Sequence, residues 1–227
     1  MTTVLITGAN RGIGLELVKH YLSAGARVHA CCRNPGAADA LRALSGDLVI
    51  HALDTTDHAA VEALGTSVSE AVDIVIANAG VYGQSRTGQS FSDLTADELS
   101  YVLNVNTVST LKTLQAFLPH VRKSAGKKMV AITSKMGSIA DASGGAVAYR
   151  ASKTALNMIM SVGAYELKND GIAVGTLHPG WVRTDMGGPN GMISPEESAR
   201  GLAAVIETLE PSDEATFKDY SGAPIGW

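Results

Sequence analysis

The stretch Thr7-Gly8-Ala9-Asn10-Arg11-Gly12-Ile13-Gly14 decides the fold of this chain. It follows the apolar, strand-like run Thr3–Thr7 and opens an amphipathic segment. Gly8 can take backbone angles that other residues avoid, Gly12 lets the backbone approach a pyrophosphate, and Gly14 allows close packing of helix on strand. The amides and the positive dipole end of a helix N-terminus bind anions. The turn therefore predicts a nucleotide site, and a purely structural turn is the alternative.

The rest of the chain repeats this order of a strand followed by a helix. Such alternation favours one parallel, doubly wound α/β sheet with helices on both faces and right-handed crossovers. Because no linker, composition shift or repeat divides the sequence, we expect a single domain over residues 1–227. The expected strands are Thr3–Thr7, Arg27–Cys32, Leu48–Leu53, Asp73–Asn78, Met129–Ser134 and Ala173–His178. The expected helices are Gly14–Ala24, Ala37–Leu44, Asp57–Glu70, Thr95–Ser124, Ala148–Lys168 and Pro195–Leu209.

Composition and charge exclude several classes of protein. The 227 residues are 45% hydrophobic and 18% charged, which excludes a disordered or fibrous chain. The net charge is −4 without a basic block, so nucleic acid and anionic membranes are poor partners. Cys31 and Cys32 are adjacent and unsuited to a mutual disulfide, and the scattered histidines predict no catalytic metal. No apolar run is long enough for a membrane span and no basic leader precedes Val4, so we expect a cytoplasmic protein.

Tyr149 and Lys153 lie four residues apart at the start of an apolar segment, so a helix places both on one face. A nearby ammonium favours tyrosinate and lowers the pKa of a phenol, which is ordinarily near 10. A phenol tuned in this way is a competent general acid or base for interconverting alcohols and carbonyls. We therefore predict that Tyr149 is the proton donor and acceptor. The alternative is that Tyr149 only packs while Lys153 reaches solvent.

Two further polar residues complete the candidate catalytic set. Ser134 ends an expected strand at the ligand-binding edge, where its hydroxyl can stabilise a developing oxyanion, and Thr133 is the competing assignment. Asn106 lies inside an expected helix, where asparagine is unfavourable and a buried one needs a polar partner. Asn104 competes with Asn106 for this position.

Taken together, these motifs resemble the short-chain dehydrogenase/reductase family. The resemblance implies a Rossmann-type domain that transfers hydride between a nicotinamide cofactor and a small-molecule carbonyl or alcohol. The compact Gly180–Pro189 segment and Pro-Ile-Gly-Trp at 224–227 resemble the branch of C-factor and sniffer-type carbonyl reductases. Some members of that branch are tied to intercellular signalling, so a dinucleotide-binding regulatory protein with little turnover is the alternative function. The matching residues are Gly8–Gly14, Asn78-Ala79-Gly80, Asn106, Ser134, Tyr149, Lys153 and Pro179-Gly180.

The resemblance also implies roles for individual residues. Asn106 would hold a water in a proton relay to Lys153, and Lys153 would bond the nicotinamide ribose. Asp54 would lie near the adenine, and Asn78 would form part of the cofactor wall. The residues expected to bind the cofactor are Gly8, Asn10, Arg11, Gly12, Ile13, Gly14, Arg33, Asp54, Asn78, Ala79, Gly80, Tyr149, Lys153, Pro179, Gly180, Val182 and Thr184.

The residues after the second expected strand favour NADP(H) over NAD(H). Enzymes that use NAD place a carboxylate there, which bonds the adenosine ribose. This chain has Cys32 at that position, followed directly by Arg33, whose planar fork of donors can grip a 2′-phosphate. Arg11 in the glycine turn is placed to reach the same phosphate from the other side. The alternative is that both arginines are solvated surface charges.

The segment between Thr184 and Ser194 is far shorter than the substrate lid usual in the family. Substrate selection therefore falls on Val81–Phe91, Met136–Val147 and Arg183–Ile193. Trp227 either anchors its own segment or lines the site, and the sequence leaves these two alternatives equal. Met158 and Met160 are expected to pack. By family analogy, the helices at 95–124 and 148–168 are candidate surfaces of a homodimer or homotetramer.

Overall fold

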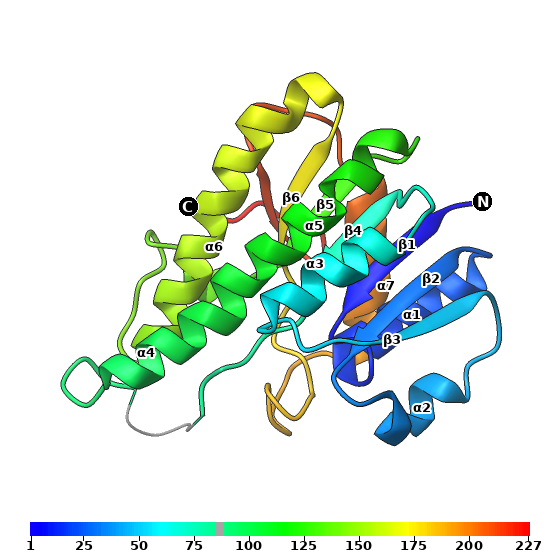
Figure 1. Cartoon of the computed structure of the whole chain (residues 1–227). Helices are drawn as coiled ribbons and strands as arrows, with labels where there is room; N and C mark the ends of the chain where they lie inside the picture. Colours follow the sequence, from blue (N-terminus) through cyan, green and yellow to red (C-terminus); the bar gives the residue numbers. More distant parts are fainter. Residues whose placement is uncertain (85–88) are drawn as a thin grey trace.

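A seven-stranded parallel sheet forms the centre of the computed structural model, which describes residues 1–84 and 89–227 (Figure 1). The strand order is β3-β2-β1-β4-β5-β6-β7, so the direction of winding reverses beside β1. Ligands of such sheets bind beyond the carboxyl ends of the strands, near this reversal. The strands are β1 (Thr3–Thr7), β2 (Arg27–Cys32), β3 (Leu48–Ala52), β4 (Ile74–Ala77), β5 (Lys128–Ile132), β6 (Ala173–His178) and β7 (Thr216–Asp219).

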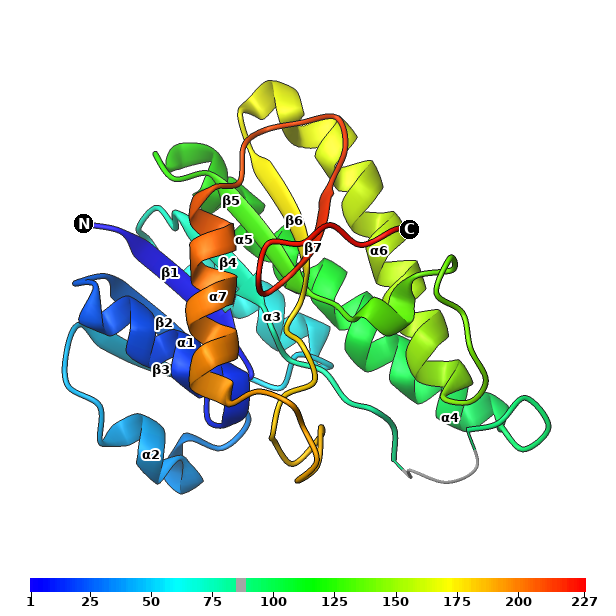
Figure 2. The same cartoon turned by 180° about the vertical axis from the view of Figure 1, so that it is seen from behind.

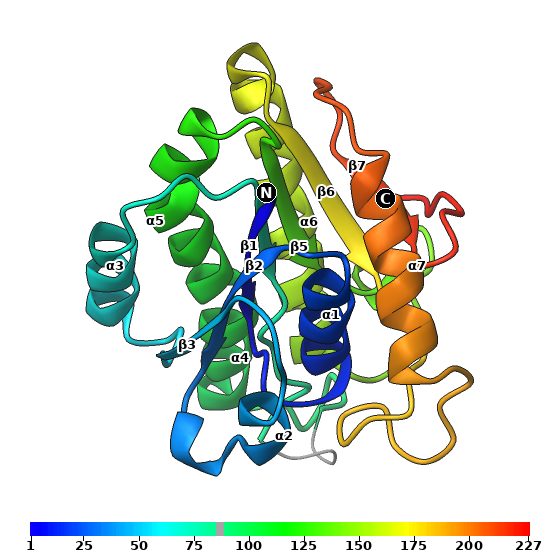
Figure 3. The ribbon, with the colours of Figure 1, turned by 90° about the vertical axis from the view of Figure 1, so that its right-hand side faces the viewer.

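Helices cover both faces of this sheet, which confirms the predicted doubly wound fold. Figure 2 shows α1 and α7 on one face, and Figure 3 shows the sheet nearly edge-on with α3 and α5 on the other side. Among the described residues, none of the helices combines the length and the apolar character that crossing a membrane requires. The helices are α1 (Gly12–Ser23), α2 (Asp39–Arg42), α3 (His58–Ser67), α4 (Ala96–Leu103), α5 (Ser109–Lys123), α6 (Val147–Leu167) and α7 (Pro195–Glu207).

The sheet separates two apolar cores, because successive side chains of a strand point to opposite faces. Val4 and Ile6 of β1 pack with the side of α1 and α7, whereas Leu5 packs with the side of α3, α5 and α6. All five residues of β1 are buried, as expected for a central parallel strand. This burial holds the carboxyl ends of the strands, and the loops that follow them, in a fixed arrangement.

Apart from small shifts at element ends, the structure differs from the predicted elements in three places. The helix expected at Ala37–Leu44 is reduced to the four residues of α2, Asp39–Arg42. The single helix expected at Thr95–Ser124 is divided into α4, a π-helical turn at Asn104–Val108, and α5. The Ser109 hydroxyl donates to the Asn104 carbonyl at 2.8 Å within this turn. Strand β7 was not predicted, because its four residues include a lysine and an aspartate and therefore form no apolar run.

Candidate active site

The glycine turn after β1 has the backbone that its residues predicted. Gly8 and Gly12 have φ angles of +66° and +53°, in the left-handed region that residues with a side chain rarely occupy. A Cβ atom at Gly14 would lie 2.2 Å from the Gly8 carbonyl oxygen. Only glycine therefore allows α1 to begin this close to the end of β1.

Helix α1 begins without a side-chain cap in the described chain, since Arg11 at its N-cap position makes no capping hydrogen bond. The starts of α3, α4 and α7 are capped by Asp57, Thr95 and Ser194, whose side chains accept from backbone amides. The first-turn amides of an uncapped helix can bind an anion, which the helix dipole also attracts. The turn thus fits a phosphate group.

Asn78 and Thr7 hold the glycine turn in place. The Asn78 side chain donates to the carbonyls of Thr7 and Gly8 at 2.9 and 3.2 Å. The Thr7 hydroxyl accepts from the amides of Asn78 and Ala79, each at 3.1 Å. These bonds join the end of β1 to the end of β4, so Asn78 in this structure braces the turn from behind.

The two arginines predicted at a 2′-phosphate make different contacts. Arg11 Nη1 lies 2.5 Å from Asp185 Oδ2, with both side chains largely exposed, so Arg11 reaches the loop after β6. Hydrogen bonds from the amide and hydroxyl of Thr56 lower the pKa of Asp54, and the charge of Arg33 lowers it further. Arg33 and Asp54 follow the paired parallel strands β2 and β3, so both lie at the same edge of the sheet.

Tyr149 and Lys153 lie in the first two turns of α6, with Lys153 Nζ 5.8 Å from the centroid of the Tyr149 ring. Burial raises the pKa of Tyr149 to about 12, against a smaller lowering by its hydrogen bond with Ser134. Burial lowers the pKa of Lys153 to about 8. The pKa of Tyr149 is thus raised in this chain, where the ammonium was expected to lower it, because desolvation by burial is the largest influence on the phenol.

Ser134 lies beside Tyr149 at the carboxyl end of β5. Its hydroxyl accepts from the Met136 amide at 3.1 Å and is hydrogen-bonded with Tyr149. The Thr133 hydroxyl instead donates to Asn157 Oδ1 at 2.7 Å. Lys153 Nζ donates to the Ile132 carbonyl at 2.8 Å. The structure thus brings three of the predicted catalytic residues together at one strand end.

Asn106 is fully buried in the π-helical turn, and its side-chain amide is occupied. Its Oδ1 accepts from the Val81 amide at 2.8 Å, and its Nδ2 donates to the Val81 carbonyl and to Ser152 Oγ. Both amide protons are therefore used to tie the loop after β4 to α6. A Cβ at Gly80 would lie 3.1 Å from Asn106 Oδ1 and 3.6 Å from Lys153 Nζ, which places Asn106 near the lysine. Its water-holding role stays a prediction.

The residues predicted at the nicotinamide end form the loop after β6, which is braced internally. Val182 makes a β-bridge with Ile193, and the Thr184 hydroxyl accepts from the Gly187 amide at 3.0 Å. Gly180 has a φ of +85°, and a Cβ there would lie 2.6 Å from Ile193 Cδ1. The Pro179 carbonyl accepts from Ser198 Oγ in α7. A Cβ at Gly12 would lie 3.3 Å from Thr184 Cγ2, so this loop contacts the glycine turn.

His178, which directly precedes Pro179, was missed by the sequence reasoning. Burial lowers its pKa to about 4, although the Asp219 carboxylate acts in the opposite direction. Its Nδ1 atom is buried and has no hydrogen-bond partner in the part of the chain that the structure describes. The sequence feature that could have drawn attention to His178 was its position at the end of a predicted strand. Within residues 1–84 and 89–227, no group of three or more His, Cys, Asp or Glu side chains is arranged to hold a metal ion.

The segments predicted to select substrate are held by local hydrogen bonds. Residues 85–88 of the Val81–Phe91 segment lie outside the described residues. The Gln89 side chain donates to the Tyr82 carbonyl at 3.0 Å, and the Gln89 carbonyl accepts from the Val147 amide. In the loop after β6, Trp181 Nε1 donates to the Gly187 carbonyl at 2.8 Å.

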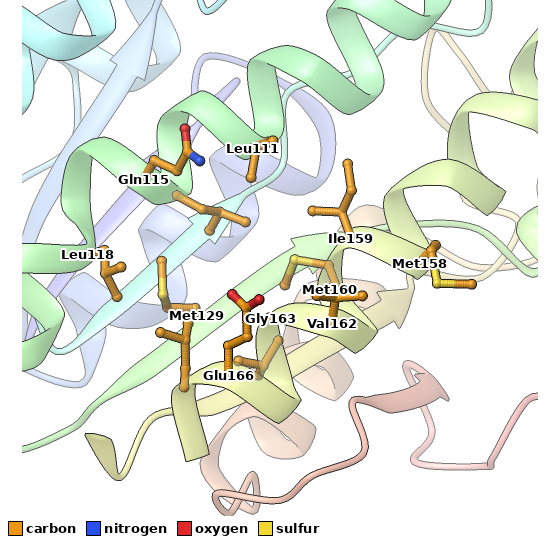
Figure 4. A pocket seen from close by; sticks show the side chains of 13 residues that line it. Leu111, Gln115, Leu118, Met129, Met158, Ile159, Met160, Val162, Gly163 and Glu166 are labelled. Atoms are coloured by element: carbon orange, nitrogen blue, oxygen red, sulfur yellow. The ribbon is translucent and has the colours of Figure 1, made fainter. Parts of the chain in front are cut away.

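A separate apolar groove lies between α5 and α6 and has a cavity volume of about 350 Å³ (Figure 4). Its lining side chains come from these two helices and from the starts of β5 and β6. Met160 is buried, as predicted, but Met158 is 65% exposed at the groove, so the prediction that Met158 packs was wrong. Met158 points outward from α6, so its side chain stays exposed and does not pack in the core.

Comparison with known proteins adds to this geometry. The model of the short chain dehydrogenase family matches residues 2–192. The C-signal of Myxococcus xanthus is 38% identical over 157 residues, which cover 69% of this chain and 93% of the relative. The 1-hydroxy-2-glutathionyl-2-methyl-3-butene dehydrogenase of Rhodococcus sp. (strain AD45) is 34% identical over 235 residues. The match covers 100% of this chain and 100% of the relative.

Solved structures of similar proteins share the whole architecture. The carbonyl reductase Sniffer of D. melanogaster superposes with a TM-score of 0.93 at 30% identity, and each chain is covered completely. The NADPH-bound carbonyl reductase from chicken fatty liver has a TM-score of 0.92 at 34% identity, covering 100% of this chain and 94% of that one.

Proposed function

The chain belongs to the short chain dehydrogenase family, and on that premise we propose that it is a carbonyl reductase that uses NADP(H). The observation that carries the proposal is the buried Ser134, Tyr149 and Lys153 group at the same sheet edge as an uncapped, glycine-lined helix start. Relatives support this reaction class, because one of them is named a dehydrogenase and two solved neighbours are carbonyl reductases.

The donor groups at this edge suit NADP(H). The first-turn amides of α1 suit the pyrophosphate, and Arg33 suits the 2′-phosphate, with Cys32 buried where a carboxylate would repel it. Arg11 can contact the same 2′-phosphate as Arg33 only after its ion pair with Asp185 is broken. When bound, the cofactor supplies a hydride to the carbonyl carbon or accepts one from the alcohol. The NADPH carried by the chicken neighbour supports this assignment.

The side chains of the candidate catalytic group have complementary roles. A pKa of about 12 keeps the Tyr149 hydroxyl protonated at neutral pH, so it is ready to donate a proton to a carbonyl oxygen. Ser134, hydrogen-bonded with Tyr149, positions that oxygen. Lys153, with a pKa of about 8, can give up and regain a proton near neutral pH.

The substrate is a small-molecule carbonyl or alcohol. Large apolar side chains are exposed in all three segments predicted to select it, including Phe91, Ile139 and Met192. Because small apolar pockets discriminate by only a few kcal/mol, we expect several unrelated carbonyl compounds to be accepted.

The proposed function is tested by following NADPH oxidation with a panel of ketones, aldehydes and quinones. We expect several of them to be reduced by the wild type, and none at a comparable rate by the Tyr149→Phe variant. Tight NADPH binding without oxidation by any carbonyl would overturn the proposal and favour a dinucleotide-binding regulatory protein.

We also propose that a second copy of this chain covers the groove between α5 and α6. The groove is apolar, and Met158 and Val162, which line it, are 65% and 49% exposed. A patch of this kind on a charged, folded chain indicates an interface. Sedimentation should show a dimer for the wild type and a monomer for Val162→Glu; a monomeric wild type would refute this assembly.

We place this single catalytic domain, residues 1–227, in the cytoplasm. Cys31 and Cys32 are both free and buried, which suits a reducing compartment. Fractionation of cells that carry a tagged chain tests this placement.

A further inference from the structure

We propose that Trp227 is a positioning residue that fixes one wall of the substrate site. The substrate wall is defined here as the loop Ser138–Ala146, between the 3₁₀ turn Lys135–Gly137 and helix α6. The inference rests on the proposed function, because the wall affects catalysis only if a substrate binds beside Tyr149.

The substrate wall connects two residues of the candidate catalytic group. Ser134 caps the 3₁₀ turn before the wall, and Tyr149 lies in the first turn of α6 after it. The wall has little packing of its own, because Cβ atoms at Gly144 and Gly145 would meet open space. Ile139 within it is 71% exposed. The loop therefore joins Ser134 to Tyr149 along the chain, and its position depends on contacts from outside the loop.

Trp227 makes the contact with the substrate wall that comes from furthest along the chain. Its carbonyl accepts a hydrogen bond from the Ala140 amide at 3.0 Å, in the middle of the wall. Among the described residues, further side-chain tethers come from residues that flank the wall: Lys135 pairs with Asp141 at 3.6 Å, and Arg150 donates to the Ser143 hydroxyl. These flanking side chains are anchored near the wall itself, whereas Trp227 connects the wall to strand β7.

Trp227 is itself held on the sheet. Its ring lies 4.9 Å from the ring of Phe217, which is buried in β7. The Ile225 amide donates to the Phe217 carbonyl at 2.9 Å, and Pro224 makes an antiparallel bridge with Lys218. The segment 221–227 thus folds back along β7, as the red trace in Figure 2 shows. Trp227 transmits the fixed position of the sheet to the wall through one backbone hydrogen bond.

This arrangement distinguishes the two sequence-based alternatives for Trp227. The ring anchors its own segment against Phe217, and the backbone carbonyl acts on the wall. Loss of the ring should release the carbonyl and let the wall move. Substrates large enough to contact the wall should then bind more weakly, whereas the proton transfer from Tyr149 should be unchanged.

The test compares Trp227→Ala and Trp227→Phe with Tyr165→Ala, which removes an exposed aromatic ring from the distant part of α6. Hydrogen exchange of the peptide that contains residues 138–146 should be about three- to tenfold faster in Trp227→Ala, which is the range expected for loss of one hydrogen bond. The KM of a bulky aromatic ketone should rise by a similar factor, while kcat, the KM of a small aldehyde and the NADPH Kd stay unchanged. Trp227→Phe should restore both readouts, and Tyr165→Ala should alter neither.

Unchanged exchange in the substrate wall, or an equal loss for small and bulky substrates, would overturn the inference. If Trp227→Ala does not fold, Trp227→Leu replaces it, since leucine keeps apolar contact with Phe217 but not the ring. If the wild type reduces no carbonyl compound, the proposed function fails, and hydrogen exchange alone decides whether Trp227 holds the wall.

Discussion

The glycine turn and the start of α6 lie at the same edge of the sheet, but they prepare for chemistry in different ways. The turn is made of backbone: two glycines with positive φ, an uncapped helix start and the bracing amide of Asn78. The start of α6 depends on side chains that are removed from water. Burial moves the pKa of Tyr149 to about 12, and that of Lys153 to about 8.

This difference shows which part of the site is ready for its ligand once the chain has folded. Backbone amides do not titrate, so the turn can bind an anion as soon as the chain has folded. The buried phenol and ammonium are held toward their neutral forms, because the low-dielectric interior disfavours both charged forms. Their charge states therefore respond to whatever charge is placed beside them.

The largest effect is expected from Tyr149→Phe, which keeps the ring and removes the hydroxyl. The kcat for carbonyl reduction should fall by about 10²-fold or more, as for the loss of general acid catalysis. The NADPH Kd, measured by titration, should stay near the wild-type value, because the ring still packs. Tyr165→Phe, on the exposed side of α6, is the matched control. Most of the wild-type kcat surviving in Tyr149→Phe would remove Tyr149 from the mechanism.

The next effect tests the phosphate-binding half of the comparison. Arg11→Ala combined with Arg33→Ala should weaken NADPH binding by at least the value of the one charge-assisted hydrogen bond lost with Arg33, about 1.5–3 kcal/mol. Arg11 adds less than a full bond, since it must leave Asp185. NADH binding should change little, and Arg42→Ala, which removes an exposed arginine paired with Asp39, should change neither. Tighter wild-type binding of NADH than of NADPH would contradict the assignment.

Gly14→Ala tests whether the glycine turn needs the close approach between Gly14 and the Gly8 carbonyl. The new Cβ would lie 2.2 Å from the Gly8 carbonyl oxygen, so the turn or α1 must shift. Overpacking of this kind costs about 1–3 kcal/mol, and we expect a loss of this size in the free energy of unfolding. NADPH binding should also weaken. Gly163→Ala in α6, where a Cβ meets open space, is the control and should not lower the free energy of unfolding, since alanine favours a helix. Wild-type stability of Gly14→Ala would show that the turn is more adaptable than this geometry indicates.

The smallest effect concerns the pH and another buried side chain, His178 at the end of β6. Because burial lowers the pKa of His178 to about 4, the unfolded chain binds a proton below pH 6.5 that the folded chain resists. The free energy of unfolding should therefore fall as the pH drops from 6.5 to 4. Between pH 6.5 and about pH 5.5, His178→Gln should reduce this fall by about 1 kcal/mol in denaturant titrations, and His20→Gln on α1 is the control. Equal slopes for wild type and His178→Gln would refute this role of burial.

Much of the fold and of the site could be predicted from the sequence, because those features depend on short-range order. Apolar runs predicted six of the seven strands, whereas the four-residue β7 has no such run. The spacing of Tyr149 and Lys153 predicted a shared helix face, and the glycine turn predicted its own backbone. These features require only helical or strand periodicity and the freedom of glycine at a few positions.

The tertiary structure decided how the site residues are paired and how their charges behave. It joined Asn106 to Val81 and Ser152, Arg11 to Asp185, and Trp227 to Ala140, in each case across a long stretch of chain. It also reversed the expected direction for the pKa of Tyr149. The spacing of residues in a sequence determines which local conformations are available. The dielectric around a group and its hydrogen-bond partners exist only after distant segments pack together, so the chemistry of the site is decided at that level.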